Sequence, residues 1–212
     1  MSAREVILAR LAAACSGLAP GEDVESHIHR HSRGPIPLLE HDIVARFQSK
    51  ASKLSSDIAQ VPDMAGAPGV IAQYLREREL PSQAVCWPSL RDLAWSAAGL
   101  TVEARSARAS DLVGITGAYC GIAETGTLMF LSGPDTPPAV SLLPETHVAV
   151  LPVSRIVPAM EDAWALLRKE HGKLPRAVNF VSGPSRTADI EQTVTLGAHG
   201  PYRVLIVLEV AG

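Results

Sequence analysis

A glycine-rich stretch from Val113 to Pro134, VGITGAYCGIAETGTLMFLSGP, most constrains how this chain can fold. Its glycines separate short apolar runs, and it carries one carboxylate, Glu124. Glycine inside a strand weakens it, so such glycines mark bends, bulges or points where backbone or ligand comes close. The stretch therefore predicts either a ligand site around Glu124 or an ordinary buried hairpin whose glycines serve its turns.

Length and charge narrow the class of protein. The 212 residues are enough for one α/β domain with a sizeable core. The formal net charge is −3, so the chain lacks the basic excess that binding to a phosphate backbone requires. We therefore expect no nucleic-acid partner.

The three cysteines indicate which cofactors the chain can hold, and the apolar segment near the N-terminus indicates whether it can enter a membrane. Cys15, Cys86 and Cys120 are far apart, without a CxxC pair or a histidine at zinc-like spacing. This disfavours a disulfide scaffold, a structural zinc and a self-held iron–sulfur cluster. The apolar segment 6–14 is interrupted by Arg10 and is too short to span a bilayer. We expect a cytoplasmic protein with reduced thiols and no membrane segment.

The first sixty residues predict a helical extension, 1–60, packed on the core. Ser2 and Glu5 form a capping-box pattern that opens a short amphipathic helix. Apolar residues with a period near four predict one long amphipathic helix over 38–60. The segment between them carries three alternating histidines, His27, His29 and His31. A solvated loop is favoured over a metal site here, because no carboxylate or cysteine completes a set of metal ligands.

Residues 61–212 alternate short apolar strands with helices. The pattern predicts helices over 67–79, 88–99 and 158–171, and strands over 84–87, 100–104, 147–151, 177–181 and 204–210. Such alternation is typical of a three-layer α/β fold, a mostly parallel sheet with helices on both faces. Ligands of these sheets bind beyond the carboxyl ends of the strands, so the residues that follow each strand are informative.

The run SGPSRTADIE, which follows the strand ending at Val181, predicts an anion cradle. It reads as a tight turn that opens a short helix, whose free N–H groups would bind phosphate or carboxylate together with Ser185, Arg186 and Thr187. The alternative is simple capping, with Ser185 and Asp189 satisfying backbone donors and Arg186 paired with an acid.

Two further loops supply candidate groups. Ser154 and Arg155 follow the strand over 147–151, and His199 lies between glycines before the last strand, where it could act as acid or base or simply fix the loop. We predict that Arg155, Arg186 and His199 surround Glu124 at one rim of the sheet, without a metal. The candidate catalytic residues are Glu124 and His199, and the candidate binding residues are Gly121, Thr125, Gly126, Thr127, Ser154, Arg155, Gly183, Ser185, Arg186 and Thr187.

Four runs, in this order and spacing, resemble the lactate utilization protein C family of LUD-domain proteins: GIAETGTL, VLPVSRIV, SGPSRTADIE and GAHGP. The resemblance makes 61–212 a LUD-type α/β domain and implies a fold similar to the sugar-phosphate isomerase and CoA-transferase-like group. It also implies a role in oxidising L-lactate to pyruvate beside iron–sulfur oxidoreductase subunits. It establishes no catalytic residue.

Three functions remain open at this point. The first is an accessory subunit of lactate oxidation that binds a small carboxylate or phosphate, with iron–sulfur clusters only in its partners, because this chain has neither cluster cysteines nor a GxGxxG after its first strands. The second is a stand-alone enzyme acting on a phosphorylated, nucleotide or CoA-linked small molecule, with Glu124 as nucleophile or base. The third is a non-catalytic sensor of a small acid.

Overall fold

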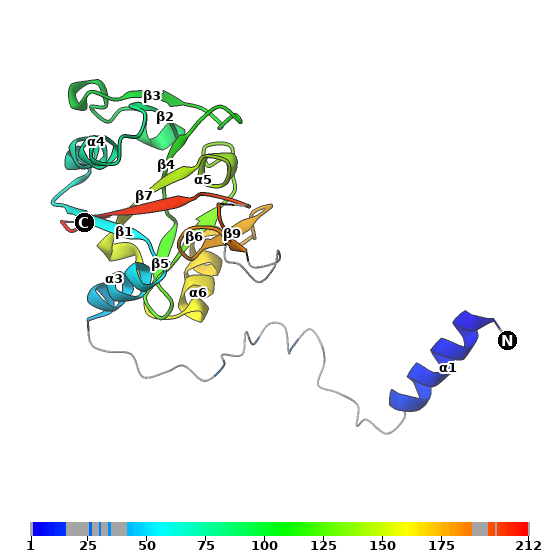
Figure 1. Cartoon of the computed structure of the whole chain (residues 1–212). Coiled ribbons are helices and arrows are strands. Elements are labelled where there is room, and N and C mark those ends of the chain that lie inside the picture. The colour runs from blue at the N-terminus through cyan, green and yellow to red at the C-terminus, as the bar shows by residue number, and fades with distance from the viewer. Residues whose placement is uncertain are drawn as a thin grey trace. The chain divides into compact units, whose positions relative to one another are not determined.

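The computed structural model describes residues 2–15, 26, 30, 34, 42–187, 195–197 and 199–211 (Figure 1). The chain forms two compact units, Met1–Pro37 and Leu38–Gly212, and each is described by itself. The histidines of the predicted loop, His27, His29 and His31, lie outside the described residues, as does His41.

The first unit contains helix α1 (Ala3–Cys15), where the sequence predicts a helix. Its capping box is present: the N–H of Ser2 donates to Glu5 Oε2 at 2.7 Å, and the N–H of Glu5 donates to Ser2 Oγ at 3.3 Å. The prediction that this helix is amphipathic is wrong, because the consecutive apolar residues 6–8 point to three sides of it and are all exposed. No helix in the described part of the chain has the length and apolar character needed to cross a membrane.

A six-stranded parallel sheet is the centre of the second unit (Figure 1). Its two longest strands are apolar runs buried on both faces, as expected for parallel strands covered from both sides. The strands follow one another across the sheet in the order β1 (Asp57–Val61), β12 (Arg203–Glu209), β7 (Thr146–Pro152), β4 (Val113–Gly117), β2 (Gln83–Cys86) and β3 (Thr101–Ala104).

The glycine-rich stretch also builds part of a second sheet, of four strands, which the sequence did not predict. After β4 the chain forms an antiparallel hairpin, so the stretch is both a hairpin and the wall of two pockets described below. The predicted strand over 177–181 exists, but it pairs antiparallel with the hairpin and not with the parallel strands. The order of this sheet is β8 (Ile156–Val157), β5 (Cys120–Ile122), β6 (Thr127–Leu131) and β9 (Val178–Val181).

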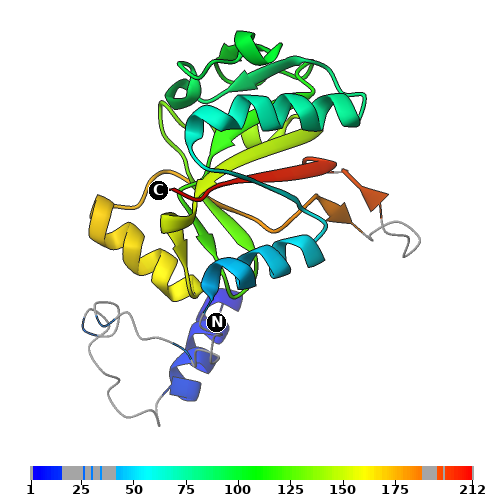
Figure 2. The same cartoon turned by 90° about the vertical axis from the view of Figure 1, so that its left-hand side faces the viewer.

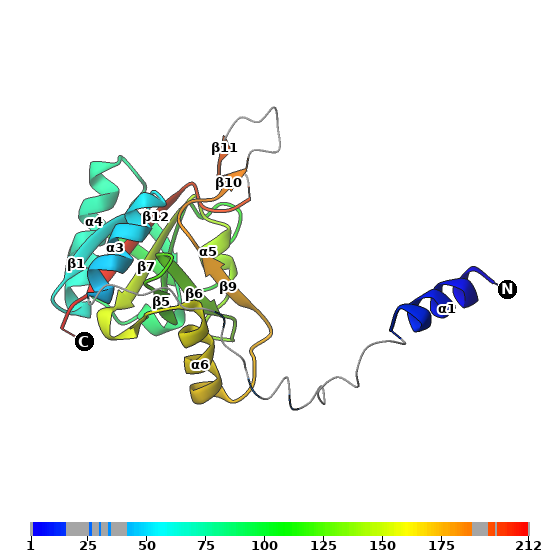
Figure 3. The ribbon, with the colours of Figure 1, turned by 90° about the horizontal axis from the view of Figure 1, so that it is seen from below.

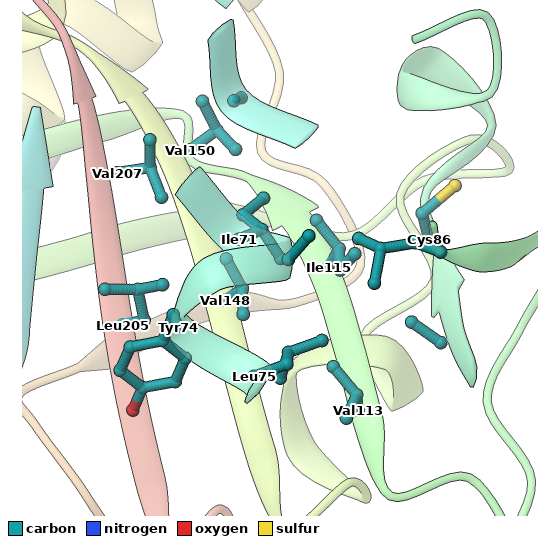
Figure 4. Close-up of a cluster of buried hydrophobic side chains, with 14 of the residues drawn as sticks. Ile71, Tyr74, Leu75, Cys86, Val113, Ile115, Val148, Val150, Leu205 and Val207 are labelled. Atoms are coloured by element: carbon teal, nitrogen blue, oxygen red, sulfur yellow. The ribbon is translucent and has the colours of Figure 1, made fainter. Parts of the chain in front are cut away.

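Helices cover both faces of the parallel sheet, which confirms the predicted α/β fold (Figure 2). Helix α4 (Ala67–Glu77) covers one face, where its Ile71 and Leu75 pack against side chains of β4, β7 and β12 (Figure 4). Helices α3 (Ile43–Lys53) and α5 (Ala139–Leu142) cover the other face together with the second sheet. Helix α6 (Met160–His171) packs on the far side of β5 and β6 and ends at Gly172, as predicted.

Two predicted helices are wrong in part. The helix expected over 38–60 ends at Lys53, since Ser55 takes a left-handed φ of 68° and the following residues form β1 beside β12. The periodicity of Ile58 with the helix is therefore accidental. The helix expected over 88–99 is two short 3₁₀ turns, η2 (Pro88–Leu90) and η3 (Ser96–Ala98), although Gly99 does end the segment with a φ of 82°.

The helix expected to begin at Ser185 is also wrong. Residues 186–187 form β10 (Arg186–Thr187), which pairs antiparallel with β11 (Thr195–Leu196) (Figure 3). The remainder of the predicted helix, 188–191, lies outside the described residues. Residues 42–60, which the sequence assigns to an N-terminal extension, belong to the same compact unit as the sheet.

Candidate functional site

The parallel sheet reverses its winding between β2 and β4. From β2 the chain proceeds to β3 on one side, and from β4 it proceeds to β7 on the other, while β2 and β4 are neighbours. In open α/β sheets, such a reversal leaves a crevice at the carboxyl ends of the two strands, and ligands bind there. A ligand site is therefore expected just after Cys86 and Gly117.

A pocket of about 600 Å³ lies at this place. Trp87 and Ser89 line it from the end of β2, and residues 117–119 line it from the end of β4. Residues 131–136, which follow β6, close one side, and the end of α6 closes another through His171, Lys173 and Pro175. We call this the switch-point pocket.

Tyr119, one wall of the switch-point pocket, is held by an ion pair. Its hydroxyl donates to Glu170 Oε2 at 2.7 Å, and Arg155 Nε donates to its carbonyl oxygen at 2.9 Å. The guanidinium of Arg155 lies 4.7 Å from the centre of the Tyr119 ring and donates to both oxygens of Glu170, at 2.7 and 2.9 Å. Paired bonds of this kind fix orientation as well as charge.

The charges of this network follow from its bonds. The hydrogen bonds from Arg155, and then that from Tyr119, lower the pKa of Glu170 to about 2. Burial, together with the bond to Glu170, raises the pKa of Tyr119 to about 12. The carboxylate stays ionised and the phenol stays neutral around pH 7, so the wall keeps one arrangement.

Arg155 is a predicted site residue, but it does not lie beside Glu124, its predicted neighbour. Its guanidinium is engaged by Tyr119 and Glu170 at the Cys120 end of β5, whereas Glu124 follows the opposite end of that strand. Exposed Ser154 lies beside it in the turn after β7. Sequence reasoning missed the lining residues of the switch-point pocket. Trp87 and Tyr119 come just after β2 and β4, so reading the residues after each strand could have found these two.

Glu124 lines a second pocket, of about 590 Å³, which we call the Glu124 pocket. The turn between β5 and β6 supplies Glu124, Thr125 and Thr127, and α3 and its end supply Lys50, Lys53 and Leu54. The remaining walls are Met160, Phe180 and Ser182. Two ammonium groups and three hydroxyl groups thus line one hollow with a single carboxylate.

Glycine explains how α3 comes so close to this turn. Gly126 has a φ of 70°, its N–H donates to the carbonyl of Ile122 at 2.9 Å, and a Cβ there would lie 2.3 Å from the backbone nitrogen of Ala51. The N–H of Glu124 donates to the carbonyl of Pro158 at 2.9 Å. Gly121 serves packing, since a Cβ on it would lie 2.7 Å from the Leu151 side chain.

Hydroxyl groups connect the turn to the chain after β9. Thr125 Oγ1 donates to Thr127 Oγ1 at 2.7 Å, and Thr127 Oγ1 shares a hydrogen bond of 2.7 Å with Ser182 Oγ. These three side chains line the Glu124 pocket together with the two lysines and Glu124. The arrangement can bind a small anion that also carries a hydroxyl group.

The segment after β9 wraps the carboxyl end of α3. Gly183 has a φ of 77°, and a Cβ on it would lie 2.2 Å from the carbonyl oxygen of Leu54. Arg186 Nη2 donates to the same carbonyl at 3.3 Å and to Ser55 Oγ. Arg186 therefore neighbours the Glu124 pocket through Leu54, and its charge is placed where a helix carboxyl end favours a cation.

Ser185 and His199 lie together at another place. The N–H of Ser185 donates to the carbonyl of Pro201 at 2.9 Å, and the N–H of His199 lies 3.4 Å from Ser185 Oγ. The predicted anion cradle at a helix start is thus wrong, because the N–H of Ser185 is bonded within a loop and half-buried Thr187 belongs to a strand. His199 is exposed and precedes the amino end of β12.

The predicted gathering around Glu124 at one rim is therefore wrong for Arg155 and His199, whereas Arg186 neighbours the Glu124 pocket through Leu54. Arg155 follows the carboxyl end of β7, whereas Arg186 contacts residues that precede β1, and His199 precedes β12. The physical reason is the direction of β9: it runs antiparallel to β6 in the second sheet, so the segment after it returns toward the amino ends of the parallel strands.

Neither a metal cluster nor a reactive thiol is evident in the part of the chain that the structure describes. Within the described residues, no group of three or more histidine, cysteine or acidic side chains is placed to hold a metal ion. Cys86 and Cys120 are both buried, and burial raises the pKa of their thiols to about 11 and about 12.

The fold and its switch-point pocket define an α/β protein built on a parallel sheet, and comparison with known proteins gives the family. The model of the LUD domain family matches residues 89–208, so the chain belongs to that family. A crystal structure of a DUF162 family protein from Deinococcus radiodurans has the same fold, with a TM-score of 0.60 and 24% identity over 81% of this chain and 99% of that one.

Curated relatives carry a functional name. Lactate utilization protein C of Bacillus subtilis (strain 168) is 33% identical over 156 residues, which cover 70% of this chain and 65% of the relative. Lactate utilization protein C 1 of Bacillus mycoides is 40% identical over 118 residues, which cover 54% of this chain and 50% of the relative. These matches span less than two thirds of the relatives' own length.

Proposed function

We propose that this chain is a cytoplasmic accessory subunit in the oxidation of L-lactate to pyruvate, and that it binds a small carboxylate in the Glu124 pocket. The observation that carries the proposal is the 33% identity, over 70% of this chain, to a protein named lactate utilization protein C. Because the matches cover only part of the relatives, the activity of the whole relatives comes to this chain as a proposal.

The chemistry of the Glu124 pocket supports a hydroxy acid as the ligand. Lys50 and Lys53 attract a carboxylate, and the hydroxyl chain of Thr125, Thr127 and Ser182 keeps one O–H free to donate to it. The carboxylate of Glu124 accepts a hydrogen bond from the 2-hydroxyl group of the bound acid. Arg186 supports the wall through Leu54, whereas His199 and Arg155 have no part in this proposed site.

Iron–sulfur oxidoreductase subunits are the proposed partners. A two-electron oxidation needs an electron acceptor, and clusters in partner proteins would supply it. Iron binds thiolates, and the raised pKa values of Cys86 and Cys120 disfavour that form at these two positions. This observation supports the division of labour that we propose.

Growth on lactate tests the role of the pocket. A strain lacking the gene should fail to grow on L-lactate but grow on pyruvate, and the wild-type chain should restore growth. Glu124→Gln and the double variant Lys50→Gln/Lys53→Gln should restore it poorly, whereas Lys169→Gln, on the exposed side of α6, should restore it fully. Full rescue by both pocket variants would remove the Glu124 pocket from the proposal.

Purification tests the proposed partnership. The tagged chain should recover proteins with the visible absorbance of iron–sulfur clusters, and the complex should reduce a dye with L-lactate. The chain alone should show no turnover under the same conditions. Robust lactate oxidation by the isolated chain would contradict the accessory role, and growth of the deletion strain on L-lactate would contradict the pathway.

A further inference from the structure

We propose that the switch-point pocket is a separate binding site for a nucleotide, that is, a planar heteroaromatic ring joined to a sugar and a phosphate. The site lies where β2 and β4 diverge, which is the usual ligand position in open α/β sheets. The Glu124 pocket shares no lining residue with it, so the two proposals are independent.

The size of the pocket leaves room for a cofactor-sized ligand. Its volume is about 600 Å³, inside the range of roughly 300–1,000 Å³ found for drug-sized and cofactor-sized ligands. The pocket can therefore hold a whole nucleotide.

The walls favour a flat ring over a bare sugar phosphate. Trp87, Tyr119 and Leu131 present mostly carbon surface, and the indole N–H of Trp87 is already used by the carbonyl of Pro137 at 3.2 Å. A sugar needs many hydrogen-bonding partners, whereas a heteroaromatic ring stacks on aromatic faces and edges. Arg155 and Glu170 hold the Tyr119 ring in place before any ligand arrives, which lowers the cost of ordering it on binding.

The rim carries the groups that the other two parts of a nucleotide require. Asp135 is an acceptor for ribose hydroxyl groups, and Lys173 is a cation for the phosphate. Ser89 adds a hydroxyl group at the mouth. One pocket thus offers an apolar wall, a carboxylate and an ammonium group, which match the base, the sugar and the phosphate.

Calorimetric titration of the whole chain with adenosine monophosphate and with flavin mononucleotide tests the proposal. At least one of the two should bind, and the matching nucleoside, adenosine or riboflavin, should bind about fivefold more weakly because it lacks the phosphate. Ribose 5-phosphate, which lacks the ring, should not bind at millimolar concentration. Failure of both nucleotides to bind, or equal binding of ribose 5-phosphate, would overturn the inference.

Paired variants locate the binding. Ser89→Trp fills the mouth of the pocket and should weaken the nucleotide at least about tenfold, whereas Ser96→Trp, equally exposed on η3, should not. Lys173→Gln should weaken the nucleotide about fivefold and leave the nucleoside unchanged, and Lys169→Gln should change neither. Nucleotide binding that survives Ser89→Trp would place the site elsewhere and overturn the inference. Growth on lactate is not the readout, so this result and that of the Glu124 variants stay distinguishable.

Discussion

The two pockets lie at opposite ends of strand β6, and different physical devices build them. Thr127 begins the strand in the Glu124 pocket, and Leu131 ends it in the switch-point pocket. The first is a tight turn pressed under α3, with charged and hydroxyl side chains. The second is a crevice between diverging parallel strands, with the aromatic residues Trp87 and Tyr119 in its walls. The same hairpin therefore lines two pockets of similar size that are built in different ways.

The largest expected effect on stability is that of replacing Gly126, the glycine in the turn between β5 and β6. Gly126→Ala should lower the free energy of unfolding by about 3 kcal/mol or more, since it combines a left-handed φ with a Cβ placed 2.3 Å from Ala51 N. Gly172→Ala is the matched control: its φ is 64° but nothing lies within 4 Å, so it should cost only about 1 kcal/mol. Urea unfolding measures both, and equal losses would mean that α3 does not press on the turn.

The stability of the fold should fall at acidic pH because of His147, which packs behind β6. His147 is fully buried against Phe130, its Nε2 lies 2.8 Å from Thr116 Oγ1, and burial lowers its pKa from 6.5 to about 3. Between pH 6.5 and about pH 3, His147 is therefore protonated in the unfolded chain but neutral in the folded chain. Stability is fully present above pH 6.5 and falls as the pH drops from 6.5 toward 3, by up to about 2 kcal/mol at pH 5.

Urea unfolding at pH 7 and pH 5 checks this dependence. His147→Leu should flatten the slope between the two, whatever its effect on absolute stability. Its Nδ1 has no hydrogen-bond partner among the residues that the structure describes, so the hydrogen bond lost with the ring is the one to Thr116. An unchanged slope in the variant would assign the acid sensitivity to other groups.

The switch-point end depends on a half-exposed ion pair, so its effect on stability should be smaller. Glu170→Gln should cost about 1 kcal/mol near pH 7, after allowance for solvent screening of the pair with Arg155. The pKa of Glu170 is lowered from 4.5 to about 2, so its contribution is present above pH 4.5 and is lost as the pH falls toward 2. Wild type and variant should converge in stability below that window, and a constant gap down to pH 2 would show that the charge of Glu170 is not the cause.

The smallest effect is expected at the hydroxyl chain of the Glu124 pocket. Thr125→Ala removes the exposed end of that chain and should cost about 0.5 kcal/mol, because a neutral hydrogen bond near water contributes little. Thr127→Ala breaks both bonds of a buried hydroxyl and should cost more. A larger loss at Thr125 than at Thr127 would reverse the proposed order.

The sequence by itself determined the local elements. Apolar runs predicted the strands that became β7 and β12, because strands buried on both faces need no alternation. Acids early, bases late and Gly172 at the end predicted α6, and four ordered motifs indicated the family. The glycines between 113 and 134 marked a hairpin and its close contact with α3, though not the identity of that neighbour.

Only the tertiary structure decided which loops meet. Arg155 contacts Glu170 and Tyr119, Glu124 shares a pocket with two lysines of α3, and His199 lies before the amino end of β12. The local pattern of 177–181 is the same whether the strand runs parallel in one sheet or antiparallel in another, and that direction decides where the following loop lies. Direction and neighbours are set by contacts between residues far apart in the chain, and local periodicity carries no information about them.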